Sequence, residues 1–153
     1  MNTLLNELHV YHHDVATIIN RINGLLGVLK DESCGSADCQ QLFKLLDALH
    51  GDAERRHHEN EELIRRALLA TRAPIHQRVK DIERDHHGFE RIAAQLKTLE
   101  DSGLAPREMA AFVEDYIHKY FDHMDAEENI FFPMAEKWLA DNQWQEVKRQ
   151  WKR

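Results

Sequence analysis

The chain has few of the residues that interrupt helices or cross-link small proteins. Its 153 residues include only 3 prolines, 6 glycines and 2 cysteines. Proline and glycine are common in the turns that connect the strands of many-stranded folds, so their scarcity favours a helical protein. With 42% hydrophobic and 31% charged residues, the chain can bury a core without disulfide support. We therefore expect an all-α fold in which residues 1–153 form one domain.

The sequence also lacks a surplus of positive charge and a long apolar run. The net charge is -7 with histidine counted as neutral, which argues against binding to the phosphate backbone of nucleic acids. No stretch approaches the roughly 18 apolar residues of a membrane span, and residues 1–8 do not resemble an export signal. We expect a cytoplasmic protein with no nucleic-acid partner and no membrane contact.

Cysteine chemistry is not expected to matter here. Cys34 and Cys39 share a short polar segment with the composition of a loop, and no basic side chain flanks Cys39 to activate it. Their spacing also differs from the Cys-x-x-Cys pattern of structural zinc sites. We expect two free surface thiols.

Apolar residues recur with helical periodicity in four long stretches and one short tail. The stretches cover about 2–29, 38–70, 79–102 and 105–134, and the tail covers 141–153. Asp38 is a candidate N-cap for the second stretch. Long helices joined by short connections predict an up-down-up-down antiparallel four-helix bundle with a short C-terminal helical tail.

Histidine is abundant, with 11 residues, and its placement is the most informative feature of the sequence. Each predicted long helix has one histidine on its apolar stripe: His12, His57, His86 and His123. Glutamates follow three of these histidines four residues later, as Glu61, Glu90 and Glu127. A histidine and a glutamate at this spacing project from one helix face, so packed helices can aim them at a common point. The neighbouring His13, His58 and His87 are predicted to face solvent.

These inward-facing side chains predict a metal site. Several imidazoles and carboxylates buried together cost much free energy unless a cation balances them. The predicted ligands are His12, His57, Glu61, His86, His123 and Glu127. Glu90 and His50 are possible additional ligands. Glu90 could equally be an outer hydrogen-bond acceptor or a flanking residue, and a partly exposed position near the bundle end is favoured for His50.

The type of ligand restricts the metal. Imidazole and carboxylate without thiolate suit iron or manganese, and also zinc. Six ligands exceed the needs of one tetrahedral zinc, so a dinuclear site is predicted, in which each ion has about two histidines and shares the carboxylates.

Two other motifs fit less well. His58-Glu59 begins like the His-Glu-x-x-His motif of zinc proteases, but Glu62 occupies the place of the second histidine. A ferritin-like site is suggested by Glu-x-x-His at Glu54 and at Glu83. These motifs fall on the second and third helices, however, and the first helix has no inward-facing glutamate.

The chain resembles the hemerythrin-like family, also called the HHE cation-binding domain, over nearly its whole length. The similarity lies in the segments 8–12, 56–62, 85–86 and 123–133, of which the last, with His-Met-x-x-Glu-Glu followed by Phe-Pro, is the most specific. The resemblance implies a non-haem di-iron site with terminal histidines and bridging glutamates. The histidines are His12, His57, His86 and His123, and the bridges are Glu61 and Glu127.

The sequence departs from the oxygen-carrying hemerythrins at two positions. They have a second histidine four residues after the first on the third helix, where this chain has Glu90, and an aspartate in place of Glu127. The resemblance therefore implies a di-iron protein that engages oxygen or nitric oxide for sensing, storage or detoxification, and a binding protein rather than an enzyme. A di-iron oxidase or peroxide-reducing enzyme, an iron-handling protein, and a bundle that metal merely stabilises remain alternatives. Zinc or manganese could substitute for iron.

Overall fold

The computed structural model describes residues 2–31 and 35–153, and these residues form helices without any strand. The elements in chain order are α1 (Thr3–Leu29), α2 (Ser36–Leu49), α3 (Asp52–Leu69), α4 (Gln77–Lys80), α5 (Ile82–Glu100), α6 (Pro106–Ala126), the π-helical segment η1 (Glu127–Phe131), α7 (Phe132–Trp138) and α8 (Asp141–Gln150). The predicted all-α class is confirmed. Cys34 lies outside the described residues, whereas Cys39 lies on α2 and is half-buried against the core.

The first helix agrees closely with its predicted range. The side chain of Asn2 caps α1 by accepting a hydrogen bond of 2.8 Å from the backbone N–H of Leu4. The buried face of α1 follows the predicted stripe through Leu8, His12 and Val15. An uninterrupted helix of 27 residues thus places His12 at a fixed phase relative to the apolar residues on both sides of it.

The second predicted helix is wrong in one respect, because it is interrupted. His50 ends α2, and Gly51 adopts an extended conformation with φ -82° and ψ -170° before α3 begins. The predicted N-cap Asp38 is also wrong: Gly35 is the N-cap, and the carboxylate of Asp38 accepts a hydrogen bond of 2.9 Å from its N–H. Just after the interruption, Ala53, predicted to face inward, is exposed and Glu54 is buried, whereas the rest of the predicted stripe from His57 to Leu68 is buried as expected.

The fourth predicted helix also contains an irregularity. Pro106 opens α6 at the predicted position, and the chain then continues through η1 into α7. The N–H of Phe132 bonds to the carbonyl of Glu127, five residues earlier, which is the π-helical pattern. Pro133 follows at once, and its missing N–H removes one donor from the ordinary helical ladder at this point.

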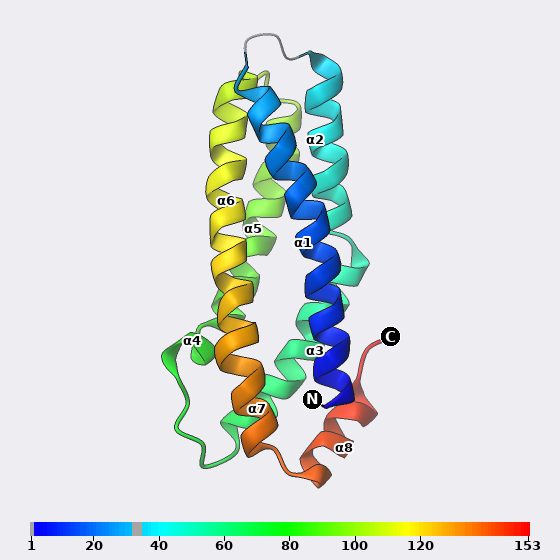
Figure 1. The fold of residues 1–153 in the computed structure, drawn as a ribbon, viewed down its shortest axis with the longest axis vertical. Helices are drawn as coiled ribbons and strands as arrows, with labels where there is room; N and C mark the ends of the chain where they lie inside the picture. The colour runs from blue at the N-terminus through cyan, green and yellow to red at the C-terminus, as the bar shows by residue number, and fades with distance from the viewer. Residues whose placement is uncertain (1, 32–34) are drawn as a thin grey trace.

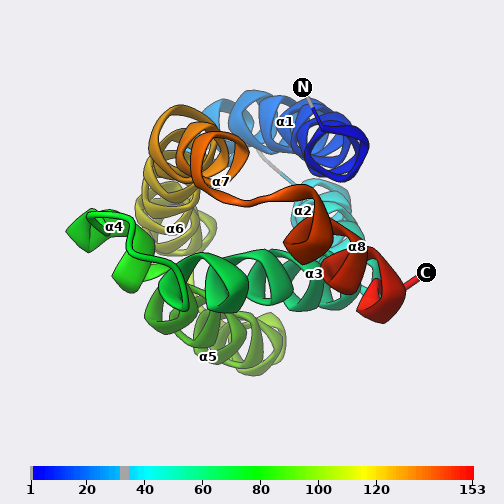
Figure 2. The same cartoon turned by 90° about the horizontal axis from the view of Figure 1, so that it is seen from below.

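The long helices run along the long axis of the molecule (Figure 1). Seen along that axis, α1, α6, α5 and α3 follow one another around the centre, and α8 lies beside α3 (Figure 2). The C-terminal segment is fastened to α3, since the side chain of Asn60 donates to the carbonyl of Lys152 at 3.0 Å and accepts from its N–H at 2.7 Å. None of the described helices is long and apolar enough to span a membrane.

The apolar core is divided into two clusters. One contains the α1 residues from Val15 to Leu29 together with residues of α2 and α6, and the other contains Leu4, Leu5 and Leu8 with residues of α3, α7 and α8. His12 lies in the stretch of α1 between the two clusters. The interior between them is polar, and it contains the predicted metal ligands.

Candidate metal centre

All six predicted ligands are buried in the polar region between the two apolar clusters. His12 comes from α1, His57 and Glu61 from α3, His86 from α5, His123 from α6, and Glu127 from the first residue of η1. The structure therefore brings together residues that are up to 115 positions apart in the sequence. Each side chain sits on the face that its helix turns toward the centre, as the periodicity predicted.

One group of potential ligands surrounds His12. Ligand atoms of His12, His57, Glu61 and Glu127 all lie within 4.8 Å of one another. The Nε2 atoms of His12 and His57 are 3.0 Å apart, and His57 Nε2 is 3.1 Å from Glu61 Oε1. Two imidazole nitrogens that face each other across such a distance can both direct lone pairs at a cation placed between them.

A second group contains only histidines. Ligand atoms of His58, His86 and His123 also lie within 4.8 Å of one another. His86 packs against both of the others, with ring centroids 3.8 Å from His58 and 4.9 Å from His123. The two groups are adjacent, so the centre offers two sets of donors rather than one.

The two glutamates connect these groups. Glu61 Oε1 lies 3.1 Å from His57 Nε2 and 3.4 Å from His86 Nε2. Glu127 Oε1 lies 3.3 Å from His12 Nε2 and 3.0 Å from His123 Nε2. Each carboxylate therefore reaches histidines of both groups.

Unsatisfied hydrogen-bonding atoms are concentrated in this centre. Among the described residues, the buried side-chain N and O atoms without a hydrogen-bond partner are both oxygens of Glu61, both ring nitrogens of His86, Nε2 of His123 and Oε2 of Glu127. A buried polar atom without a partner costs about 1–3 kcal/mol, and more when it is charged. All of these atoms belong to residues that can bind a cation, and bound cations would satisfy all of them except Nδ1 of His86, which lies 3.8 Å from Glu62 Oε1 on the other edge of the ring. The residues present fit a metal centre.

The π-helical segment sets the direction of two consecutive glutamates. Glu127 Oε1 approaches His12 Nε2 at 3.3 Å, and Glu128 Oε1 approaches Nδ1 of the same ring at 2.8 Å. Two neighbouring residues of a regular α-helix point about 100° apart and seldom reach one side chain. Irregular π turns are frequent at functional sites, and η1 places one carboxylate at each ring nitrogen of this imidazole.

Carboxylates outside the centre orient the histidines. Asp85 Oδ2 lies 3.1 Å from His123 Nδ1, and Glu128 accepts from Nδ1 of His12. In both rings Nε2 is then the nitrogen left for the interior. A carboxylate on the far nitrogen fixes the tautomer of a metal-binding histidine and increases its basicity.

The buried charges strongly perturb the protonation of the centre. Burial alone would lower the pKa of His12, but Glu127, Glu128 and Glu61 together raise it to about 12. Against the same effect of burial, the pKa of His86 is raised to about 10, chiefly by Glu127 and Glu61.

His123 and Glu127 form a pair with opposite shifts. Glu127 and Asp85 overcome burial and raise the pKa of His123 to about 9. Burial and the neighbouring Glu61 would raise the pKa of Glu127, but His123 and His12 lower it to about 2. The metal-free centre therefore balances its carboxylates with protons held on histidines, and a cation would replace those protons.

The two possible additional ligands lie away from the centre. The side chain of Glu90 is 67% exposed and pairs with His87 Nδ1 at 3.6 Å. His50, the last residue before the interruption at Gly51, is hydrogen-bonded to the hydroxyl of Tyr116. Neither residue belongs to the two groups of potential ligands.

Three of the predicted ligands are followed by a second histidine that was predicted to face solvent: His13, His58 and His87. This prediction is right for two of these second histidines and wrong for one. His13 and His87 are exposed, as predicted. His58, predicted to face solvent, is only 9% exposed and stacks on His86. The buried face of α3 is wide enough to include both His57 and His58.

A buried network around Glu54 was missed by the sequence analysis. Glu54 accepts hydrogen bonds from Tyr11 at 2.7 Å and from Tyr120, and His58 Nε2 lies 2.8 Å from its Oε1. Burial and His86 lower the pKa of His58, so its neutral ring donates an N–H. Although burial would raise the pKa of Glu54, the hydrogen bonds from His58 and Tyr120 and the nearby imidazoles of His58 and His57 lower it to about 2. The spacing of four between Glu54 and His58 was the available sequence signal.

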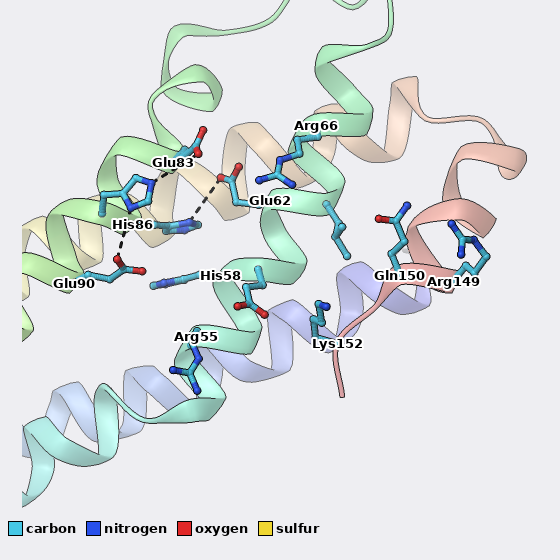
Figure 3. Close-up of a pocket in the computed structure, with 13 residues that line it drawn as sticks. Arg55, His58, Glu62, Arg66, Glu83, His86, Glu90, Arg149, Gln150 and Lys152 are labelled. Carbon is cyan, nitrogen blue, oxygen red and sulfur yellow. Dashed lines mark ion pairs between the residues drawn. The ribbon is translucent and has the colours of Figure 1, made fainter.

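A groove on the surface leads toward the second group of histidines. It has a volume of about 640 Å³ and is lined by residues of α3, α5 and the C-terminal segment, including His58, His86 and Glu62. Figure 3 shows the rings of His58 and His86 side by side in this groove. Solvent can thus approach the edge of the centre between α3 and α5.

The comparison with known families agrees with this geometry. The model of the family described as the hemerythrin HHE cation binding domain matches residues 3–135, which include every residue of both ligand groups. None of the curated proteins and none of the solved structures matches the chain. From the extent of the family match, this chain belongs to the hemerythrin HHE cation-binding domain family.

Proposed function

We propose that the chain is a non-haem di-iron protein that binds a small diatomic ligand, oxygen or nitric oxide, for sensing, storage or detoxification. The proposed ligands are His12, His57, Glu61, His86, His123 and Glu127. The observation that carries the proposal is the position of the two glutamates, each of which lies within 4.0 Å of histidines from both groups. Carboxylates placed in this way are suited to bridge two ions.

The donor atoms favour iron over the other metals that the site could hold. Among the described residues, both groups offer imidazole nitrogens, and the group around His12 also offers the carboxylates of Glu61 and Glu127. Neither group contains a thiolate. This donor set suits iron, with manganese or zinc as possible substitutes. A pair of ferrous ions would supply electrons and an open coordination position for a diatomic ligand.

The fold supports a centre shared by four helices. We propose that α1, α2 with α3, α5, and α6 with η1 and α7 form the four helices of an up-down-up-down bundle. The short α8 is its C-terminal helical tail, and residues 1–153 form one domain. In this arrangement the interruptions at Gly51 and at η1 divide two of the four helices, and α3 runs obliquely to α2 (Figure 1).

Apolar and aromatic side chains restrict what can reach the centre from inside the bundle. The ring of Phe89 lies 5.0 Å from that of His123 and 5.0 Å from that of Tyr120, and Ile19 belongs to the same apolar cluster. These residues pack against the centre on that side, so we expect them to exclude water and to admit only a small ligand. A bulky substrate would require the helices to separate.

The test is an iron titration followed by optical spectroscopy. We expect about two iron ions per chain, and we expect the visible spectrum of the reduced protein to change when oxygen or nitric oxide is added. A protein that retains one zinc ion per chain and gives no response to either gas would instead be a bundle that metal stabilises. Catalytic consumption of peroxide or oxygen over many turnovers would point to the enzyme alternative.

A further inference from the structure

The residues that follow α8 form a short strap over the bundle. Residues 151–153 have no helical structure and lie against α3 and α1, and we call them the C-terminal strap. The side chain of Asn60 on α3 binds both backbone groups of Lys152, at 2.7 Å for the N–H and at 3.0 Å for the carbonyl. Glu7 on α1 accepts a hydrogen bond of 3.0 Å from Trp151 Nε1. The strap therefore connects two helices that carry proposed metal ligands.

The strap separates two hollows in the surface. The groove of about 640 Å³ is lined by Lys152 on one side and reaches the rings of His58 and His86. In Figure 3, Lys152 lies on the C-terminal segment, across the groove from Glu90. A smaller hollow of about 230 Å³ is lined by all three strap residues, again including Lys152, and reaches His57. Each hollow thus reaches a proposed metal ligand, and the strap forms the wall between the two hollows.

We propose that the C-terminal strap is a gate for the metal centre: its release from Asn60 joins the two hollows into one opening over α3, through which divalent metal ions enter and leave. This inference rests on the proposed metal centre and adds a route to it, and the ligand set is unchanged. With the strap in place, only 5% of His57 and 4% of His86 are exposed, so neither ring is open to a hydrated ion. The strap lies outside residues 3–135, the part of the chain that the family model matches.

The strap is attached in a way that lets it open while the rest of the chain stays folded. Helix α8 stays in place because Trp144 and Val147 are buried in the second apolar cluster. In the strap, by contrast, Trp151 is only partly buried against that cluster, and the next two residues are exposed. Segments held mainly by hydrogen bonds, with few apolar contacts, open at a lower free energy than the whole domain unfolds. The strap can therefore detach without unfolding of the bundle.

Opening also leaves no polar group of the contact buried without a partner. Asn60 is 5% exposed while Lys152 covers it. After the strap detaches, the amide of Asn60 faces the joined opening, where water can replace the two backbone groups. The exchange of a protein partner for water costs much less than an unsatisfied buried group. The two hydrogen bonds at Asn60 thus set how often the strap opens.

An alternative role for the strap is to stabilise the fold and nothing else. The two roles make different predictions about iron. A gate changes the rates at which iron enters and leaves by the same factor, so the amount bound at equilibrium stays the same. A strap that only stabilises the fold changes the free energy of unfolding and leaves the rate of iron release from the folded protein unchanged.

The experiment compares wild type with Asn60→Ala, Trp151→Phe and the control Arg149→Gln. Asn60→Ala removes both hydrogen bonds to Lys152, and Trp151→Phe keeps an aromatic ring but removes the N–H that binds α1. Arg149 lines the same groove but is paired with Glu146 within α8, so its replacement leaves the strap bound. Each iron-loaded protein is mixed with an excess of a ferrous-iron chelator, and the initial iron content and the rate of iron release are measured. Circular dichroism reports whether each variant folds.

The expected result is faster iron release from the strap variants. Release should be about tenfold faster from Asn60→Ala, faster by a smaller factor from Trp151→Phe and unchanged in the control, with equal initial iron content in every protein. In the metal-free proteins, hydrogen exchange at the Lys152 amide and modification of His57 by diethyl pyrocarbonate should both be faster in Asn60→Ala. Release at the wild-type rate from a variant whose Lys152 amide exchanges faster would overturn the gate, because the strap would then open without an effect on iron.

The metal-free measurements separate this inference from the proposed function. If wild type binds no iron, the proposed function is wrong, but modification of His57 still tests the strap. Faster modification in Asn60→Ala than in Arg149→Gln would support the strap as the cover of this route, and equal rates would overturn it. If wild type binds iron and both strap variants start with less of it, the strap stabilises the centre instead of controlling access, and the gate is wrong.

Discussion

Glu54 is the buried carboxylate whose replacement should change how the metal-free protein responds to acid. It is 6% exposed and accepts hydrogen bonds from two tyrosines and from His58. Replacement by glutamine preserves the size of the side chain but removes the ionisable group. Glu54 is not among the proposed ligands, so the experiment does not depend on the metal.

The size of the effect follows from the pKa of Glu54. That pKa is about 2 in the folded chain, compared with 4.5 for an ordinary glutamate. Because the folded pKa is the lower one, the stabilisation is complete above the pKa of the unfolded chain and is lost as the pH falls toward 2. It amounts to about 3 kcal/mol at pH 6 and to about 1 kcal/mol at pH 3.

The assay is urea unfolding of metal-free wild type, Glu54→Gln and the control Glu59→Gln between pH 6 and pH 3. Glu59 is exposed on the same helix. The ligand carboxylates titrate in all three proteins, so the difference between wild type and Glu54→Gln isolates one group. That difference should shrink by about 2 kcal/mol as the pH falls, on top of a constant offset from altered hydrogen bonds. Parallel curves for wild type and Glu54→Gln would refute the reasoning.

Three further predictions concern the centre itself. His86→Ala should lose iron and His87→Ala should keep it, because only the first ring faces the interior; equal iron contents by elemental analysis would contradict this orientation. Glu127→Ala should abolish the spectral response to oxygen and nitric oxide while circular dichroism stays helical, and a retained response would exclude Glu127 as a bridge. The raised pKa values of His12, His86 and His123 mean that metal binding at pH 7 should release protons and weaken as the pH falls. Calorimetry in buffers of different ionisation enthalpy measures that release, and a binding enthalpy independent of buffer would argue against it.

The sequence was sufficient wherever a helix runs without interruption. The period of α1 predicts both the exposed His13 and the buried His12, because one phase holds from Thr3 to Leu29. The same holds for His86 and His87 on α5. A spacing of four also predicts that His123 and Glu127 approach each other, and their side chains lie 3.0 Å apart.

The stripe extrapolated from α2 into α3 fails at Ala53, which is exposed, and holds from His57 through Glu61 and Ile64 to Leu68. Ala53 lies in the first turn of α3, directly after the extended backbone of Gly51 that ends the run from α2. A single glycine in a long helical pattern can be tolerated or can end the helix, and local propensity does not decide between these outcomes. His58 and Glu54 lie beside the predicted stripe and are buried because α3 is covered over a face wider than that stripe, and the width of the covered face depends on packing rather than on residue spacing.

Partners from other helices were also beyond the sequence pattern. Asp85 binds His123 and Glu128 binds His12, and both contacts depend on how the helices are packed. The spacing of residues along one helix says which side chains share a face, but it does not say what that face meets. Glu128 additionally needs the π turn of η1, which no simple period describes.

The two irregular segments have a common effect on the centre. In a regular α-helix, roughly one side chain per turn points at the bundle axis. Four such helices therefore offer few metal-binding side chains at any one height along that axis. The break at Gly51 precedes a turn of α3 in which Glu54, His57 and His58 are all buried. The π turn at η1 lets Glu127 and Glu128 approach one imidazole. Both segments therefore increase the number of polar groups at the level of the centre, and each lies next to a histidine and glutamate pair. The regular helices α1 and α5 contribute one histidine apiece at that level, and the two interrupted helices supply the carboxylates.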